Sequence, residues 1–239
     1  MTASESAAAD EAALLKKWLP LYKPLASPRL RILCFPNAGS AENIYTGMAS
    51  RNKQRTPNKL MAWAGEAQAE VLAVQYPGRE SRRGEPFVKT CQEMAAALLP
   101  VVRAKLAEGE EAVPFVLVSH SCGNWIAYEL LRLLRREGLP LPKSWFVSCM
   151  ASPDIAVAAK PWKPNREMGT AQLQAECKLW DVNEAVFHPS VWPTFEPLLR
   201  ADFTLFDQYT HGSERACNVT CCVMWVLIQE DVDGLYVVS

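Results

Sequence analysis

The sequence predicts an α/β fold with a mainly parallel β-sheet, because strand-like and helix-like segments alternate along the chain. Four short apolar runs have the length and composition of buried strands: residues 30–35, 70–75, 115–118 and 145–149. Two longer stretches between them, residues 92–106 and 125–136, carry apolar side chains at helical spacing. This alternation is typical of a parallel sheet whose two faces are covered by helices.

The flanking segments suggest an extension, one domain and an insertion. Residues 1–28 are rich in Ala and Pro and predict an N-terminal extension with a helix near residues 11–18. Residues 29–239 then form a single α/β domain. Within it, residues from about 152 to 209 mix Pro, Trp and acidic residues with short amphipathic segments, and we expect them to lie over one end of the sheet. A last apolar run, residues 219–228, has the character of a strand.

The composition argues against several classes of protein. The 25 basic and 26 acidic residues nearly balance, so no net field points to a nucleic acid or an anionic membrane surface. No apolar run approaches the roughly 20 residues of a membrane span, and the start lacks the pattern of a signal peptide. We therefore expect a cytoplasmic protein. The eight cysteines include no pair with the CxxC spacing of a zinc site, so we expect no metal. We also expect no cofactor.

One segment carries the chemistry: the apolar run that begins near residue 114 enters a helix through a tight turn centred on Ser121. In a nucleophile elbow, a serine occupies a strained corner between strand and helix, and small residues two positions away on either side permit the sharp turn. Here these neighbours are Ser119 and Gly123, so a serine stands at the first small position. The context predicts an α/β-hydrolase fold with Ser121 as the nucleophile. An ordinary serine-rich turn is the plainer alternative.

Two backbone N–H groups are candidates for binding an oxyanion. Cys122 directly follows the nucleophile and its N–H suits this role, although its thiol could itself be the nucleophile. Ala38 lies in a loop of small residues after the first strand, and its N–H is the second candidate. A plain Pro-Gly turn is the alternative for that loop.

Five blocks of the chain carry a family resemblance. They are Leu33-Cys-Phe-Pro36-Asn-Ala-Gly39, Val74-Gln-Tyr-Pro77-Gly-Arg-Glu80 with Arg82 and Glu85-Pro86, Ser119-His-Ser121-Cys-Gly123, Phe146-Val-Ser-Cys-Met-Ala-Ser-Pro153, and Pro197-Leu-Leu-Arg-Ala-Asp202-Phe203 with Tyr209. In order and spacing, over about residues 30 to 210, they resemble the type II thioesterases of polyketide and nonribosomal peptide synthesis and the related medium-chain fatty-acid-synthase thioesterases.

The resemblance implies hydrolysis of an acyl thioester carried on the phosphopantetheine arm of an acyl carrier protein, with Ser121 as the acyl-enzyme nucleophile. It makes residues 152–209 a helical lid over the acyl chain. Apolar lid side chains could line an acyl pocket or simply pack the lid: Trp162, Leu173, Trp180, Val186, Phe187, Trp192, Phe195 and Phe203. Arg79 and Arg82 could steer a phosphate or an acidic carrier protein, with solvation at the surface as the alternative.

The C-terminal part departs from the family pattern. In this fold the triad follows the chain order Ser, acid, His, but all the histidines precede the nearest candidate acid, Asp231, and Asp233 behind it. The histidines are His120, His188 and His211. We expect His120 to point away from Ser121 and the other two to serve surface or packing roles. From about residue 225 the resemblance ends, so we expect the last strand and helix and the catalytic His to be missing from a truncated or inactive chain.

Three functions therefore stand as alternatives. The first is an acyl-thioester hydrolase, and the second is a module that binds acyl carrier proteins or acyl chains without turnover. The third is a serine esterase or lipase on the same fold. The Pro-Gly-Arg-Glu and Leu-Leu-Arg-Ala-Asp-Phe blocks favour thioesters, whereas the missing His favours binding unless His188 or His211 supplies the base.

Overall fold

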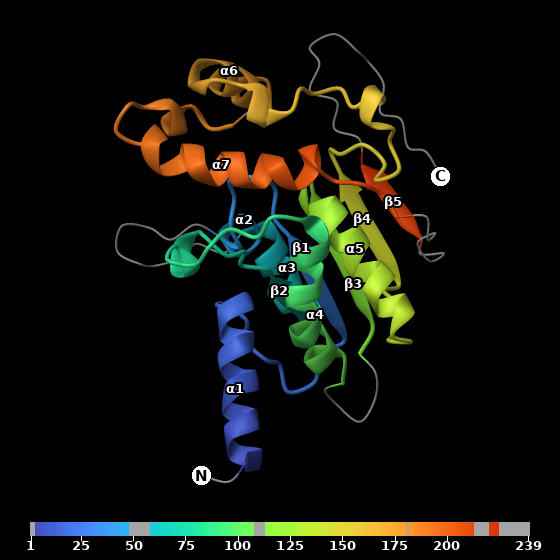
Figure 1. Ribbon diagram of the computed structural model, residues 1–239. Helices are drawn as coiled ribbons and strands as arrows, with labels where there is room; N and C mark the ends of the chain where they lie inside the picture. The colour runs from blue at the N-terminus through green and yellow to red at the C-terminus, as the bar shows by residue number, and fades with distance from the viewer. Residues whose placement is uncertain (1–2, 48–57, 108–112, 181, 213–219, 225–239) are drawn as a thin grey trace.

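The computed structural model describes residues 3–47, 58–107, 113–180, 182–212 and 220–224. Within them, five parallel strands form one sheet in the order β2-β1-β3-β4-β5 (Figure 1). The strands are β1 (Leu30–Phe35), β2 (Ala69–Ala73), β3 (Phe115–His120), β4 (Ser144–Ser148) and β5 (Cys221–Met224). The predicted parallel sheet is confirmed, and β5 falls inside the last predicted apolar run.

The connections between the strands are largely helical. The helices are α1 (Ala3–Trp18), α2 (Asn43–Thr46), α3 (Lys59–Glu66), α4 (Cys91–Ala107), α5 (Gly123–Arg136), α6 (Thr170–Leu179) and α7 (Trp192–Asp207). Short 3₁₀ turns are η1 (Glu80–Arg82), η2 (Val157–Ala159), η3 (Asn165–Glu167) and η4 (Glu184–Phe187). The two long helices predicted from periodicity are confirmed as α4 and α5. None of the helices described here is long and apolar enough to cross a membrane.

The core lies on both faces of the sheet. On one face, Leu33, Phe35 and Leu117 pack in the large apolar cluster that includes α4 and α5. On the other face, Ile32 and Cys34 belong to a smaller cluster with α3. Because side chains alternate between the two faces of a strand, β1 is buried on both sides, as helices covering both faces require.

The insertion after β4 is helical and lies across the carboxyl ends of the strands, with α7 above the sheet and α6 beyond it (Figure 1). A hydrogen bond of 2.8 Å from the Gly39 N–H, in the loop after β1, to Asp202 Oδ2 of α7 joins the insertion to the sheet. Aromatic rings pack beneath it: Trp125 of α5 lies 6.0 Å from Trp162 and 4.7 Å from Tyr209, centroid to centroid. The described part of this insertion is helical, whereas its bounds at about residues 152 and 209 and its role as a lid over an acyl chain stay predictions.

Polar contacts fasten the C-terminal end of α7. Lys160 Nζ donates to the carbonyl oxygens of Phe206, Asp207 and Tyr209 at 2.9, 3.2 and 3.3 Å. The Tyr209 hydroxyl donates to the buried Glu129 Oε1 of α5 at 2.6 Å. A lysine at a helix C-terminus satisfies carbonyl groups that have no partner within the helix and opposes the negative end of the helix dipole. The Lys160 bonds hold two parts of the lid together, and the Tyr209 bond joins the lid to α5.

The helix before β1 is longer than the sequence predicted, and its C-terminal end is buried. The helix expected near residues 11–18 begins at Ala3, consistent with the high helix propensity of alanine. Trp18 and Leu19 are buried in the larger apolar cluster. The proposed boundary at residue 28 stays a prediction, but the chain just before it packs as part of the core.

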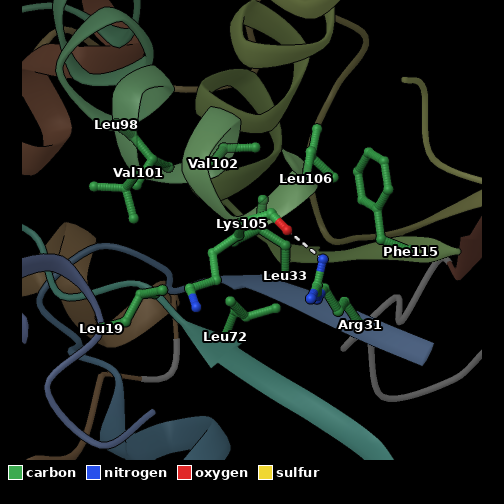
Figure 2. Close-up of a pocket in the computed structure, with 10 residues that line it drawn as sticks. All are labelled: Leu19, Arg31, Leu33, Leu72, Leu98, Val101, Val102, Lys105, Leu106 and Phe115. Carbon is green, nitrogen blue, oxygen red and sulfur yellow. Dashed lines mark hydrogen bonds between the residues drawn. The ribbon is translucent and has the colours of Figure 1, made fainter. Parts of the chain in front are cut away.

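A buried polar network ties this segment to the amino ends of the strands. Glu70 Oε1 accepts from the Tyr22 hydroxyl and Glu70 Oε2 accepts from Arg31 Nε, both at 2.9 Å. The Arg31 guanidinium also donates to the Lys105 carbonyl (Figure 2). The neighbouring apolar cavity of about 20 Å³ has room for about one water molecule. It is a gap in packing, at the opposite end of the strands from the predicted elbow.

Candidate active site

Ser121 occupies the sharp turn between β3 and α5. Its φ of 52° lies in the left-handed region, which costs a residue with a side chain free energy and is common at functional sites. The turn is fixed from both sides: the Ser121 N–H donates to the Ser148 carbonyl of β4, and the Ser121 carbonyl accepts from the Asn124 N–H, each at 2.9 Å. The side chain is half-buried. These are the features of a nucleophile elbow.

The residues two positions on either side of Ser121 fit the turn for different reasons. A Cβ atom at Gly123 would lie 2.6 Å from the Phe35 carbonyl oxygen and 2.7 Å from that of Pro36, so only glycine fits where α5 meets the end of β1. Ser119 is buried, and its hydroxyl accepts from Trp145 Nε1 at 2.7 Å and donates to the Asn124 side-chain oxygen. The serine that replaces the first small residue therefore stabilises the elbow through its own hydrogen bonds.

The two backbone N–H groups predicted to bind the oxyanion have no acceptor in another residue that the structure describes. They belong to Cys122, directly after the nucleophile, and to Ala38 in the loop after β1. The next two N–H groups of that loop are occupied: Gly39 donates to Asp202 and Ser40 to the Asn37 carbonyl at 3.2 Å. Since β1 and β3 are neighbours in the sheet, this loop follows the strand beside the elbow. The geometry fits the predicted pair of oxyanion donors.

The Cys122 thiol does not suit the role of nucleophile. The side chain is buried in the larger apolar cluster, and this burial raises the pKa of the thiol well above its ordinary value. A thiol becomes nucleophilic as the thiolate, which an apolar environment disfavours. Ser121, which is partly accessible, remains the better candidate.

The three histidines all lie within the described residues, and none forms a hydrogen bond with Ser121. His120 Nδ1 lies 3.1 Å from Ser148 Oγ, and burial lowers the pKa of this imidazole. His188 is exposed and its Nδ1 lies 2.7 Å from Ser190 Oγ. His211 is also exposed, with its ring 5.6 Å from that of Tyr128. No histidine is therefore in place as a general base for Ser121 among the described residues. Asp231 and Asp233 lie outside the described residues.

The roles predicted for Arg79 and Arg82 at the surface are wrong, because both side chains are buried and use their donors internally. Arg79 donates from Nη2 to Asp202 Oδ1 at 2.6 Å and from Nη1 to Asp202 Oδ2 at 2.7 Å. Arg82 donates to Glu85 Oε2 and to the Gln75 carbonyl, both at 2.8 Å. Neither guanidinium is solvated or free to steer an external phosphate.

A cleft of about 620 Å³ lies between the loop after β1, the segment 78–87 and the lid. Of the eight apolar lid residues for which lining an acyl pocket and packing the lid were the alternatives, Trp180, Val186 and Phe195 line this cleft. The others mostly pack the interior: Trp162, Leu173, Trp192 and Phe203 are buried, and Phe187 stacks on Trp192 with ring centroids 5.8 Å apart. Ala38 borders the cleft, whereas Ser121 is not among its lining residues. The cleft therefore borders the Ala38 loop, and none of the residues of the elbow lines it. No cluster of metal ligands occurs within the residues described.

Comparison with known proteins identifies the family. Residues 30–224 match the family model of the thioesterase domain. The chain belongs to the thioesterase domain family. The matched range runs from β1 to β5 and contains the elbow, the Ala38 loop and the lid. The resemblance drawn from the five sequence blocks is confirmed.

Individual relatives of this thioesterase-family chain are distant. Thioesterase PikA5 of Streptomyces venezuelae is 24% identical over 209 residues, which make up 87% of this chain and 66% of that protein. A probable cadicidin biosynthesis thioesterase of Streptomyces griseus is 27% identical over 211 residues, 85% of this chain and 51% of the relative. The chain thus spans less than two thirds of the length of these relatives.

Solved structures agree on the fold. The type II thioesterase BorB from the borrelidin biosynthetic cluster superimposes with a TM-score of 0.67 at 25% identity, over 85% of this chain and 75% of that chain. RedJ, a thioesterase from the prodiginine pathway of Streptomyces coelicolor, gives a TM-score of 0.66 at 24% identity, over 87% of this chain and 78% of that chain. The predicted α/β-hydrolase fold is confirmed.

Three residues that shape the site were not predicted from the sequence. Asp202 accepts from both Arg79 and the Ala38 loop, and the hydroxyls of Tyr45 and Tyr76 donate to the carbonyls of Phe35 and Pro36 at 2.9 and 3.2 Å. Asp202 and Tyr76 lie in the two most specific sequence blocks, which was the available signal. Tyr45 carried no such signal.

Proposed function

We propose that this chain is a serine thioesterase that hydrolyses acyl thioesters carried on the phosphopantetheine arm of an acyl carrier protein. The observation that carries the proposal is the left-handed Ser121 turn together with the N–H groups of Cys122 and Ala38, which have no acceptor in another described residue. Relatives named as thioesterases, such as PikA5 and BorB, favour a thioester over an oxygen ester as substrate. The location that we propose is the cytoplasm.

In the proposed reaction, Ser121 Oγ attacks the thioester carbonyl carbon, and the carbonyl oxygen becomes an oxyanion held by the two N–H groups. The C–S bond then breaks, the pantetheine thiolate takes up the proton lost by Ser121, and the acyl group remains on Ser121 as an ester. Water attacks this ester, the free acid leaves and the Ser121 hydroxyl is restored. Each half-reaction needs a base to accept a proton, and the role of Asp231 as the acid that would orient such a base stays a prediction.

One observation favours a second candidate function, the binding of acyl groups or carrier proteins without turnover. His120, His188 and His211 are all directed to partners other than Ser121. A serine hydroxyl without a base is a weak nucleophile. The cleft beside Ala38 could hold an acyl chain in either case.

The test is hydrolysis of butyryl-pantetheine by the purified chain, with intact mass recorded to detect an acylated serine. The variants are Ser121→Ala and, as a control, Ser27→Ala at an exposed position before β1. We expect turnover through Ser121 that is slower by several powers of ten than in an enzyme with a complete triad, because no histidine base is in place among the described residues. Ser121→Ala should remove both turnover and adduct, whereas Ser27→Ala should not.

The outcomes separate the two candidates. Turnover or a butyryl adduct that depends on Ser121 supports the hydrolase. Saturable binding of butyryl-pantetheine with neither turnover nor adduct supports the binding module. Neither binding nor reaction by a folded chain would refute both.

A further inference from the structure

We propose that Arg79 and Asp202 are positioning residues that hold the loop of residues 37–40 so that the Ala38 N–H faces the reacting carbonyl. The inference rests on the proposed function and extends it to two residues that act through this loop, although Arg79 also borders the cleft. It rests on a buried ion pair, Arg79 and Asp202, whose members bind each other and also the backbone of this loop.

The pair itself is almost fully buried. Only 4% of the Arg79 side chain and 3% of the Asp202 side chain are exposed, and two parallel hydrogen bonds of 2.6 and 2.7 Å join them. Burial would lower the pKa of Arg79, but the charge and hydrogen bonds of Asp202 outweigh it, and the pKa is raised above its ordinary value. Because burying two charges is costly, such a pair is weak evidence for stability alone, and a geometric role is a better explanation of its position.

Both members of the pair bind the loop after β1. Asp202 Oδ2 accepts from the Gly39 N–H at 2.8 Å, and Arg79 Nη1 donates to the Ser40 carbonyl at 3.0 Å. The guanidinium also lies 5.2 Å from the centroid of the Tyr76 ring, whose hydroxyl donates to the Pro36 carbonyl at 3.2 Å. The loop is therefore held at three backbone groups, on both sides of Ala38.

The shape of the loop depends on the same helix that carries Asp202. Gly39 has a φ of 74°, and a Cβ atom there would lie 2.8 Å from Leu199 Cδ2 of α7. The helix thus packs directly on Gly39 while Asp202, one turn further along, accepts its N–H. The Ser40 N–H donates to the Asn37 carbonyl. Of the N–H groups of Ala38, Gly39 and Ser40, only that of Ala38 therefore remains available to a ligand.

This arrangement has a consequence for catalysis. A donor stabilises an oxyanion strongly only if it is oriented before the reaction, since turning it then costs nothing during the reaction. Loss of one such donor typically slows an enzyme by about 10²–10³-fold. Releasing Gly39 and Ser40 should therefore weaken the binding of a tetrahedral oxyanion much more than the binding of a ligand without one.

The experiment compares Arg79→Lys and Asp202→Asn with the matched control Arg82→Lys in the full chain. Arg82 is as buried as Arg79 and lies in the same segment, but its bonds go to Glu85 and Gln75 and not to the loop. Two ligands are used: butylboronic acid, which forms a tetrahedral adduct on a serine, and S-butyl-pantetheine, a thioether that lacks the reacting acyl carbonyl of the thioester. Both affinities are equilibrium measurements, so they do not require turnover.

We expect both variants to weaken the boronate adduct at least about tenfold, towards the 10²–10³-fold of a lost donor, with S-butyl-pantetheine affinity changed less than about threefold. Arg82→Lys should leave both affinities near those of the unmodified chain. Equal weakening in all three variants, or none in Arg79→Lys and Asp202→Asn, would overturn the inference.

Two controls keep this result distinct from a failure of the proposed function. A boronate adduct in the unmodified chain that disappears in Ser121→Ala is required by the proposed function, and its absence would refute both proposals. Amide exchange of residues 37–40 tests the positioning separately: it should be at least about tenfold faster in Arg79→Lys and Asp202→Asn than in Arg82→Lys, because hydrogen bonds protect amides from exchange. Unchanged exchange in Arg79→Lys and Asp202→Asn would overturn the positioning role. If Asp202→Asn proved unstable, Arg79→Lys alone would decide the question, because it keeps the positive charge beside Asp202.

Discussion

Replacing Gly123 with alanine should disrupt the elbow, because the new methyl group would meet backbone. The added Cβ would lie 2.6 and 2.7 Å from the carbonyl oxygens of Phe35 and Pro36. Side-chain atoms could move aside, but these oxygens belong to β1 and to the loop that follows it. Either the start of α5 or the end of β1 must shift. The first would displace the Cys122 N–H and the second the Ala38 N–H, which are the two candidate oxyanion donors.

The expected loss of stability is large for a single methyl group. Overpacking a core typically costs 1–3 kcal/mol, and the rigid neighbours argue for about 3 kcal/mol here. For a chain of this size, about 2–4 °C of melting temperature corresponds to each kcal/mol, so we expect a fall of about 6–12 °C. The matched control is Gly65→Ala in α3, where an added Cβ has no atom within 4 Å. Alanine there should raise the stability by about 0.5–1 kcal/mol, because it favours helix over the unfolded chain.

Urea denaturation of both variants, with melting temperature as a second measure, provides the assay. The difference between the two substitutions isolates the steric contact from the general effect of replacing glycine in a helix. A Gly123→Ala chain as stable as the unmodified one would show that β1 and α5 do not approach as closely as described, and the reasoning on the elbow would fail.

Three further predictions concern stability. Ser119→Ala should cost about 1–3 kcal/mol in urea denaturation, because the Trp145 indole and the Asn124 side-chain oxygen would each lose a buried partner. The hydrogen bond from an arginine guanidinium, with a second from a lysine, lowers the pKa of Glu85 from 4.5 to about 2. Between these two pKa values the folded state binds fewer protons than the unfolded state. The contribution of ionised Glu85 to the free energy of unfolding is therefore complete above about pH 5 and lost as the pH falls towards 2. Urea titrations at pH 3, 4 and 6 should show a shallower decline in Glu85→Gln, and an unchanged decline would contradict the assignment. Lys160→Met should cost about 1–3 kcal/mol by leaving the last carbonyls of α7 without their donor, and limited proteolysis should cut the lid sooner. A lid cut at the same rate in both proteins would show that these bonds do not hold it.

The elements that were predicted correctly have local signals. The strand runs and the helical periodicity of α4 and α5 depend on neighbouring residues only, and so does the strand-turn-serine-helix order at Ser121. Gly123 was identified by its position in that pattern, although the contact that requires it, with the end of β1, lies more than eighty residues away along the chain. The tertiary structure supplied the reason for a residue that the local pattern had already marked.

The errors and omissions involve contacts between distant segments. Arg79 is a charged residue in a loop, which is typical of the protein surface. Its burial depends on Asp202, 123 residues further along the chain. Likewise, Trp162 and Trp180 are equally apolar in the sequence, yet the first is buried in the core and the second borders the cleft. No periodicity distinguishes such pairs, because burial depends on which segments fold over one another.

The sequence by itself therefore determined the parallel α/β architecture, the serine at the elbow and the family, since each rests on the order of residue types along a short stretch. Only the tertiary structure decided which N–H groups remain available beside Ser121, since that depends on where α7 crosses the loop after β1. A backbone donor is present at every residue but proline, and the sequence cannot show whether the fold already uses it. In the loop after β1, the hydrogen bond from the Gly39 N–H to Asp202 of the lid shows that the fold already uses this donor.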